Sequence, residues 1–213
     1  MLQFVTDEKS TTPVVEQIKG FINGGGRWIQ VRMDNATDEE IAKVIEEVKP
    51  LCLEVQAFLL LHDRVELAKK LDVGGVHLEK TSILPSKARL ELGPAAVIGV
   101  SANNIDEVKA VRSLDVDYIA IGPYAAGDLF DKSTPLLGLD GIKEIMSEME
   151  KLEINIAHVA AGGVDKDSLV SLLKAGANGV AVSKYLAYAE NIKKATEEFL
   201  EILKPFEKFK DEA

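Results

Sequence analysis

The chain has 213 residues, of which 46% are hydrophobic and 28% charged, an ordinary composition for a soluble globular protein. Its formal net charge of −10 argues against nucleic acid as a partner, because phosphate backbones require clustered Lys and Arg. No apolar run approaches the roughly 18 residues of a membrane helix, and the first residues do not resemble a signal peptide. The single cysteine, Cys52, lies between leucines and predicts a buried thiol in a reducing compartment. We therefore expect a cytoplasmic protein without a membrane partner.

Short apolar runs rich in β-branched residues recur along the whole chain, separated by amphipathic segments. Several are almost continuously hydrophobic, as parallel strands covered on both faces are. We expect eight strands, at 2–6, 28–33, 57–62, 74–78, 95–101, 116–122, 155–162 and 178–184.

The segments between these strands show apolar residues at three- and four-residue spacing, which predicts helices. We expect helices at 38–55 with Thr37 or Asp38 as cap, at 139–152, at 165–176 ending at Gly176, and at 191–206. Strands alternating with helices in this way predict a single (β/α)8 barrel, an α/β fold, over 1–213, with a peripheral tail from about 205. The alternative is a doubly wound open sheet, but no GxGxxG follows the first strand.

In a (β/α)8 barrel the functional residues gather at the carboxyl ends of the strands. The second strand ends with Gln30 and Arg32 on one face. Because polar residues inside a barrel are costly unless paired, Arg32 is expected to bind a phosphate or carboxylate. A structural ion pair with Asp34 or Asp63 is the alternative.

The third and fourth strands end in charged residues. His62 or Asp63 is expected at the rim, and Asp63 is expected to cap the following helix, although it could also hold a divalent cation. His77 lies within the fourth strand and is expected to be a satisfied core histidine. Glu79 and Lys80 follow it, either as site residues or as surface charges.

The fifth strand ends with Ser101 and Asn103, small hydrogen-bonding groups. The loop at 125–138 is longer than typical βα loops, which favours a functional lid from which Lys132 could reach a phosphate, or else a surface excursion.

The seventh and eighth strands end in residues suited to an anion. Gly162 and Gly163 follow the seventh strand, and Ser183 and Lys184 follow the eighth. Barrels often bind phosphate with these two loops, and glycines allow the backbone N–H groups to approach the ligand. We therefore expect a monophosphate site here.

The order of the motifs IQVR, LLLHDRVELAK, GVHL, IGVSA, DYIAIGP, GLDGI, AAGGV and AGANGVAVS resembles the thiamin phosphate synthase/TenI superfamily over nearly the whole chain. The resemblance implies a transferase of thiamin biosynthesis, in which a pyrimidine diphosphate is coupled to thiazole phosphate with Mg²⁺ present and pyrophosphate is released. It implies a dissociative mechanism, in which a stabilised pyrimidine cation is captured by the thiazole nitrogen.

The resemblance carries over only in part at the diphosphate and metal end. Gln30 and Arg32 match the family's QxRxK motif, but Asp34 replaces its lysine. Asp63 matches a metal-ligand aspartate. Ser82 stands where the family's second metal-ligating aspartate is expected, and Glu79 is a nearby candidate to replace it.

The resemblance is fuller at the monophosphate end, where Gly162, Gly163 and Ser183 match the backbone cradle for the thiazole phosphate. Ser101 also matches. Lys132 is the counterpart of a lysine in the family's threonine-rich loop.

The resemblance leaves two alternatives to a synthase. One is a TenI-like thiazole phosphate isomerase, but Asn103 stands where its tautomerase members carry a histidine, which leaves His62 for proton transfer. The other is a non-catalytic binder of phosphate ligands. The expected catalytic residues are Arg32, His62, Ser101 and Lys132; the expected binding residues are Gln30, Arg32, Asn103, Gly162, Gly163, Ser183 and Lys184; Asp63 is the expected metal ligand. A homodimer is a further expectation.

Overall fold

The fold is a closed barrel of parallel strands. The computed structural model describes residues 1–79, 82–127, 130 and 133–207. Each strand pairs in parallel with the next, and β8 pairs with β1, with Gln3 beside Ala181. The strands are β1 Leu2–Val5, β2 Trp28–Val31, β3 Phe58–His62, β4 Gly75–Leu78, β5 Val97–Ala102, β6 Tyr118–Ile121, β7 Ala157–Ala161 and β8 Val180–Val182. This closure confirms the predicted (β/α)8 barrel, since an open sheet would leave β1 and β8 unpaired.

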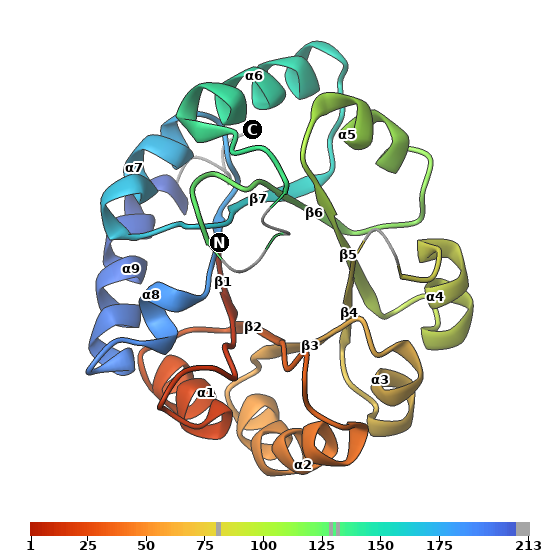
Figure 1. Ribbon diagram of the computed structural model, residues 1–213, viewed down its shortest axis with the longest axis vertical. Coiled ribbons are helices and arrows are strands. Elements are labelled where there is room, and N and C mark those ends of the chain that lie inside the picture. Colours follow the sequence, from red (N-terminus) through yellow and green to blue (C-terminus); the bar gives the residue numbers. More distant parts are fainter. Residues whose placement is uncertain (80–81, 128–129, 131–132, 208–213) are drawn as a thin grey trace.

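The helices surround the barrel as an outer ring (Figure 1). They are α1 Val14–Asn23, α2 Asp38–Glu54, α3 Val65–Leu71, α4 Pro85–Leu92, α5 Ile105–Val111, α6 Gly138–Lys151, α7 Lys166–Lys174, α8 Lys184–Ala187 and α9 Ile192–Glu207. The capping prediction for α2 is confirmed, because the Thr37 hydroxyl accepts from the N–H of Glu40 and the Glu40 carboxylate accepts from the N–H of Thr37. Among the helices of the described residues, none is long and apolar enough to cross a membrane.

The apolar residues form two cores, one on each side of the barrel wall. The larger lies between the sheet and the helices and includes Cys52, a thiol whose pKa is raised to about 11 by burial. The smaller lies inside the barrel. Its buried members are Val5, Leu60, Tyr118, Ala120, Val159, Ala161 and Ala181.

Large and small side chains occupy different levels of the barrel interior. Trp28 and Tyr118 contact each other edge to face at the starts of their strands, with ring centroids 4.8 Å apart. Tyr118 fits there because its neighbour is Gly99, where a Cβ atom would lie 2.1 Å from the phenol ring. Towards the carboxyl ends the interior residues include Ala120, Ala161 and Ala181. The interior is therefore filled at its base and open towards the rim that carries the predicted site.

Candidate functional site

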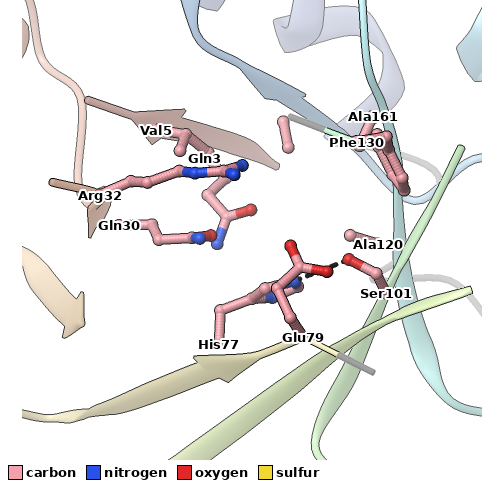
Figure 2. Close-up of a pocket in the computed structure, with 11 residues that line it drawn as sticks. Gln3, Val5, Gln30, Arg32, His77, Glu79, Ser101, Ala120, Phe130 and Ala161 are labelled. Atoms are coloured by element: carbon pink, nitrogen blue, oxygen red, sulfur yellow. Dashed lines mark hydrogen bonds between the residues drawn. The ribbon is translucent and has the colours of Figure 1, made fainter. Parts of the chain in front are cut away.

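A cavity of about 260 Å³, including the space at its mouth, occupies the open part of the barrel (Figure 2). Polar side chains reach it from β1, β2, β4 and β5, because alternate residues of a strand face the interior. We refer to it as the central cavity. It is lined by Gln3, Val5, Gln30, Arg32, His77, Glu79, Ser101, Ala120, Phe130, Ala161 and Ala181.

Two further cavities adjoin the central one. The second, of about 310 Å³, is lined by Thr6, Asp7, Glu8, Lys9, Arg32, Asp34 and Ser183. The third, of about 850 Å³, is lined by Ala126, Gly127, Gly163, Val164, Asp165, Ala181, Ser183, Lys184, Tyr185 and Tyr188. Arg32 belongs to the first and second, Ser183 to the second and third, and Ala181 to the first and third. Each of the three cavities therefore adjoins the other two at the mouth of the barrel.

Arg32 stands at the wall between the central and second cavities. Its Nε donates to both carboxylate oxygens of Asp34, at 3.1 and 3.0 Å, and its side chain is only 19% exposed. Thr6 fixes the backbone beside it, because the Thr6 hydroxyl accepts from the Arg32 N–H at 2.9 Å and donates to the Arg32 carbonyl. The ion pair with Asp34 that the sequence offered as an alternative is present, and the guanidinium still points into the central cavity (Figure 2).

His62 contacts the site from behind Gln30. The Nε2 of Gln30 lies 2.9 Å from the Nδ1 of His62. With the amide donating, Nδ1 accepts, and the ring proton is on Nε2, which faces Asp34 at 3.8 Å and Glu79 at 3.9 Å. Burial, aided by the positive charge of Arg32, lowers the pKa of His62 to about 4 against the opposite effect of Asp63 and Asp34. The imidazole is therefore neutral at pH 7 and holds the Gln30 amide in place.

Asp63 does not cap α3, so the capping expectation is wrong. The helix begins after Arg64, with no side-chain hydrogen bond at its cap. Asp63 has a φ of 59°, which turns its carboxylate towards the next strand, where Oδ1 accepts from the Glu79 N–H at 3.0 Å. Asp63 and Ser82, the two positions where the resemblance places metal ligands, both line an outer groove beside α3 and α4.

His77 and Ser101 form the floor of the central cavity. His77 is 3% exposed, its Nε2 lies 3.0 Å from the Ser101 Oγ, and its Nδ1 lies 2.8 Å from the Tyr118 hydroxyl. Burial lowers the pKa of His77 to about 3, with His62 and Arg32 adding to the effect. The expectation of a satisfied core histidine is confirmed, although this one also lines the site.

Sequence reasoning missed two members of this floor, Gln3 and Tyr118. The Gln3 Nε2 donates to the Tyr118 hydroxyl at 2.9 Å. The available signal was a glutamine at an inward-facing position of the apolar strand LQFV, because an amide inside a barrel needs a partner.

Asn103 is not among the residues that line the three cavities. Its Nδ2 donates to the carbonyl of Gly122, and its N–H donates to Glu107 at 2.7 Å. The first contact holds the end of β5 against the loop after β6, and the second ties it to α5. The binding role expected for Asn103 stays a prediction. Lys132, expected to be catalytic, lies outside the described residues.

The predicted monophosphate cradle divides into a buried and a cavity-facing part. Gly162 is buried under the loop after β6, and its carbonyl accepts from the Ala125 N–H at 2.9 Å. Gly163 lines the third cavity together with Ser183 and the exposed Lys184. The structure brings these three residues to one cavity and leaves their phosphate-binding role a prediction.

Comparisons with known proteins agree on one family. The family model described as thiamine monophosphate synthase matches residues 2–186. A thiamine-phosphate synthase of Bacteroides thetaiotaomicron is 40% identical over 190 residues, covering 89% of this chain and 91% of the relative. One from Bacteroides fragilis is 37% identical over 201 residues, covering 94% and 98%. The structure of a thiamine phosphate pyrophosphorylase from Pyrococcus furiosus superimposes with a TM-score of 0.83 at 30% identity, covering 96% of this chain and 95% of that one. The chain belongs to the thiamine monophosphate synthase family.

Proposed function

We propose that this protein is a transferase that joins a pyrimidine diphosphate to thiazole phosphate, forming thiamin phosphate and releasing pyrophosphate. In this reaction the bond between the pyrimidine methylene carbon and the diphosphate oxygen breaks, and a bond from that carbon to the thiazole nitrogen forms. The relatives named thiamine-phosphate synthase support the reaction. The observation that carries it for this chain is the group of three adjoining cavities, with Arg32 shared by the first two, Ser183 by the second and third, and Ala181 by the first and third.

These adjoining cavities suggest a place for each part of the substrates. The pyrimidine ring would occupy the central cavity, where Gln30 and Ser101 offer hydrogen bonds. Its diphosphate would lie against the guanidinium of Arg32, which suits phosphate oxygens by charge and by its forked donors. The thiazole phosphate would lie near Gly163 and Ser183, in the third cavity. The two reacting groups would then be held next to each other, which is the main task of an enzyme in a dissociative substitution.

We propose His62 as a positioning residue for Gln30. Its ring is neutral and holds the Gln30 amide, and it is not one of the residues that line the central cavity. These contacts favour the synthase over a metal-free isomerase that uses His62 for proton transfer. A cytoplasmic location and a homodimer stay predictions.

We further propose that the reaction uses Mg²⁺. The residues present suit an ion that enters the site bound to the substrate diphosphate. Within the described ranges, no group of three or more His, Cys, Asp or Glu side chains is arranged to hold a metal ion. Asp63 and Glu79 are linked by a hydrogen bond from the Glu79 N–H to the Asp63 carboxylate, and one or two carboxylates plus substrate phosphates satisfy Mg²⁺. When bound, the ion would neutralise charge on the departing diphosphate. Calorimetry should detect Mg²⁺ binding with pyrophosphate present and not in its absence, and Asp63→Asn should weaken that binding.

The synthase proposal is tested by incubating the protein with both substrates and Mg²⁺ and measuring thiamin phosphate and pyrophosphate. We expect equal amounts of the two products and none when either substrate is omitted. Absence of product at high protein concentration, with both substrates shown to bind, would instead identify a non-catalytic binder.

A further inference from the structure

The floor of the central cavity contains a buried hydrogen-bond acceptor that has no partner. Gln3 is fully buried, and its Oε1 is a side-chain atom for which the described part of the chain provides no hydrogen bond. In Figure 2 this oxygen points towards the open middle of the cavity. Leaving a buried carbonyl unpaired costs about 1–3 kcal/mol. A polar atom kept at that cost inside a cavity indicates a ligand that satisfies it.

The hydrogen bonds of the floor have a fixed direction. Because the Gln3 amide donates to the Tyr118 oxygen, the Tyr118 hydroxyl is left to donate to Nδ1 of His77. The proton of the neutral His77 is then on Nε2, which donates to the Ser101 oxygen. The Ser101 hydroxyl proton is therefore directed away from His77. The unpaired acceptor on Gln3 and the hydroxyl donor on Ser101 are therefore both available to a ligand in the cavity.

Reversing the Gln3 amide leaves Gln3 and Ser101 complementary to each other. If the Gln3 oxygen accepted from Tyr118, each bond in the series would reverse, and Ser101 would donate to His77. The cavity would then be offered a donor from the Gln3 NH₂ group and an acceptor from the Ser101 oxygen. In either direction the unpaired Gln3 group and the group that Ser101 turns to the cavity are opposite in kind, because the Tyr118–His77 link couples them.

We propose that Gln3 and Ser101 form a selectivity site for a heterocycle that carries both an amino group and a ring nitrogen. Such a ring offers an N–H donor to the Gln3 oxygen and a ring-nitrogen acceptor to the Ser101 hydroxyl. The pyrimidine of thiamin has this arrangement, so the inference deepens the proposed function and rests on it. Tyr118 and His77 act as positioning residues, because they link Gln3 to Ser101 beneath the ring.

The rest of the cavity suits a flat ring. Ala120 and Ala161 leave space above the floor, and Phe130 provides an aromatic wall. Aromatic side chains pack well against flat heterocycles. Arg32 lies on the opposite side in Figure 2, where it can receive the charged group attached to such a ring.

The inference is tested by calorimetry with two ligands, the aminopyrimidine diphosphate and the same compound with hydrogen in place of the amino group. Thiazole phosphate is omitted so that no turnover occurs. We expect the wild type to bind the amino compound at least about tenfold more tightly, the value of one net hydrogen bond. In Gln3→Met this preference should fall to about one, while the affinity for pyrophosphate stays unchanged.

Tyr118→Phe serves as the second variant if Gln3→Met does not fold, because it retains Gln3 and removes the link to His77. It should reduce the preference severalfold. Thr196→Val is the matched control, since the fully buried Thr196 hydroxyl donates to the Ile192 carbonyl within α9, away from the cavity. This variant should retain the full preference. If both Gln3→Met and Tyr118→Phe retain the wild-type preference, this inference is overturned and the proposed function is not. A wild type that binds neither pyrimidine compound would overturn the proposed function as well.

Discussion

The two sides of the barrel mouth are built from different groups. On the β7 and β8 side, the third cavity is lined at Gly163 and Ser183 by residues with little or no side chain, so that backbone forms this part of its wall. On the β2 to β4 side, Arg32 forms an ion pair with Asp34, and Arg32 and Glu79 both line the central cavity. The first side depends on backbone dihedral angles, and the second depends on the balance of charge.

This difference determines how sensitive ligand binding on each side is to substitutions. A backbone cradle tolerates substitution of the residues around it, because its donors are present in every residue except proline. A charged site changes its affinity with each substitution, and here Asp34 stands in place of a lysine. We therefore expect variants on one side to affect one substrate and to leave the other substrate's affinity unchanged.

The largest effect is expected from Arg32→Ala. Loss of the guanidinium should lower kcat/KM by about a hundredfold or more, because charge on the departing diphosphate loses its main protein partner. Calorimetry should show weaker pyrophosphate binding and an unchanged affinity for thiazole phosphate. Arg27→Ala is the matched control, since Arg27 precedes the same strand at the opposite rim and bonds to the Ile22 and Gly26 carbonyls. Equal losses for both ligands would mean that the two sides are not separate.

The next effect is expected from Gly163→Ala on the backbone side. Gly163 has a φ of 65°, and a Cβ atom there would lie 2.7 Å from the carbonyl of Ala125. We expect the KM for thiazole phosphate to rise about tenfold and the free energy of unfolding to fall by about 1–3 kcal/mol. Pyrophosphate affinity should not change.

Gly138→Ala separates dihedral strain from the clash. Gly138 has a similar φ of 61°, but no atom would lie within 4 Å of its Cβ. This variant should lose about 1 kcal/mol of stability and retain the wild-type KM for thiazole phosphate. If both glycine variants raise that KM equally, the role assigned to Gly163 is wrong.

Acid should destabilise the charged side through its histidines. Burial lowers the pKa of His62 to about 4 and that of His77 to about 3, below the ordinary 6.5. Below pH 6.5 the unfolded chain therefore binds protons that the folded chain does not, and stability falls as the pH drops. Each histidine should contribute a loss of about 2 kcal/mol between pH 7 and pH 5.

Urea denaturation at a series of pH values measures this loss. His62→Asn should remove about half of the pH dependence between pH 7 and pH 5, because one of the two buried imidazoles is gone. A wild type whose stability is constant over this range would contradict the buried, neutral state of both rings.

The period of two in a strand explains what could be predicted of the site from sequence. It placed Gln30 and Arg32 on the same inward face, and both line the central cavity. The strand and helix alternation likewise predicted the barrel, because eight such units close on themselves. These properties depend on short stretches of chain, which a single sequence displays directly.

Contacts that depend on the closure of the barrel could not be predicted in this way. Gln3 meets Tyr118 across 115 residues, and His77 meets Ser101 across 24, so neither pair follows from local spacing. Asp63 was expected to cap α3, as an aspartate before a helix commonly does. Its left-handed backbone instead turns the carboxylate away from α3, and it accepts a hydrogen bond from the N–H of Glu79, just after β4.

The smallest effect, and the sharpest test of the comparison, is expected from Asp34→Asn. Asp34 is 47% exposed, so its ion pair with Arg32 contributes only about 0–1 kcal/mol to stability. The Asn side chain keeps the shape and removes the charge that competes with a diphosphate for the guanidinium. We expect the affinity for pyrophosphate to rise about threefold, with the gain decreasing at high salt.

Thiazole phosphate binding should be unchanged in Asp34→Asn, since the contacts of Gly163 and Ser183 remain. A weaker affinity for pyrophosphate would reverse the interpretation of Asp34. It would mean that the two hydrogen bonds from the Arg32 Nε to Asp34 orient the guanidinium for the ligand, and that their loss costs more than the removal of a competing charge gains. The charged side would then be preorganised, as the backbone cradle is. The Asp34 carboxylate would fix the Arg32 guanidinium, as backbone dihedral angles fix the N–H groups of the cradle.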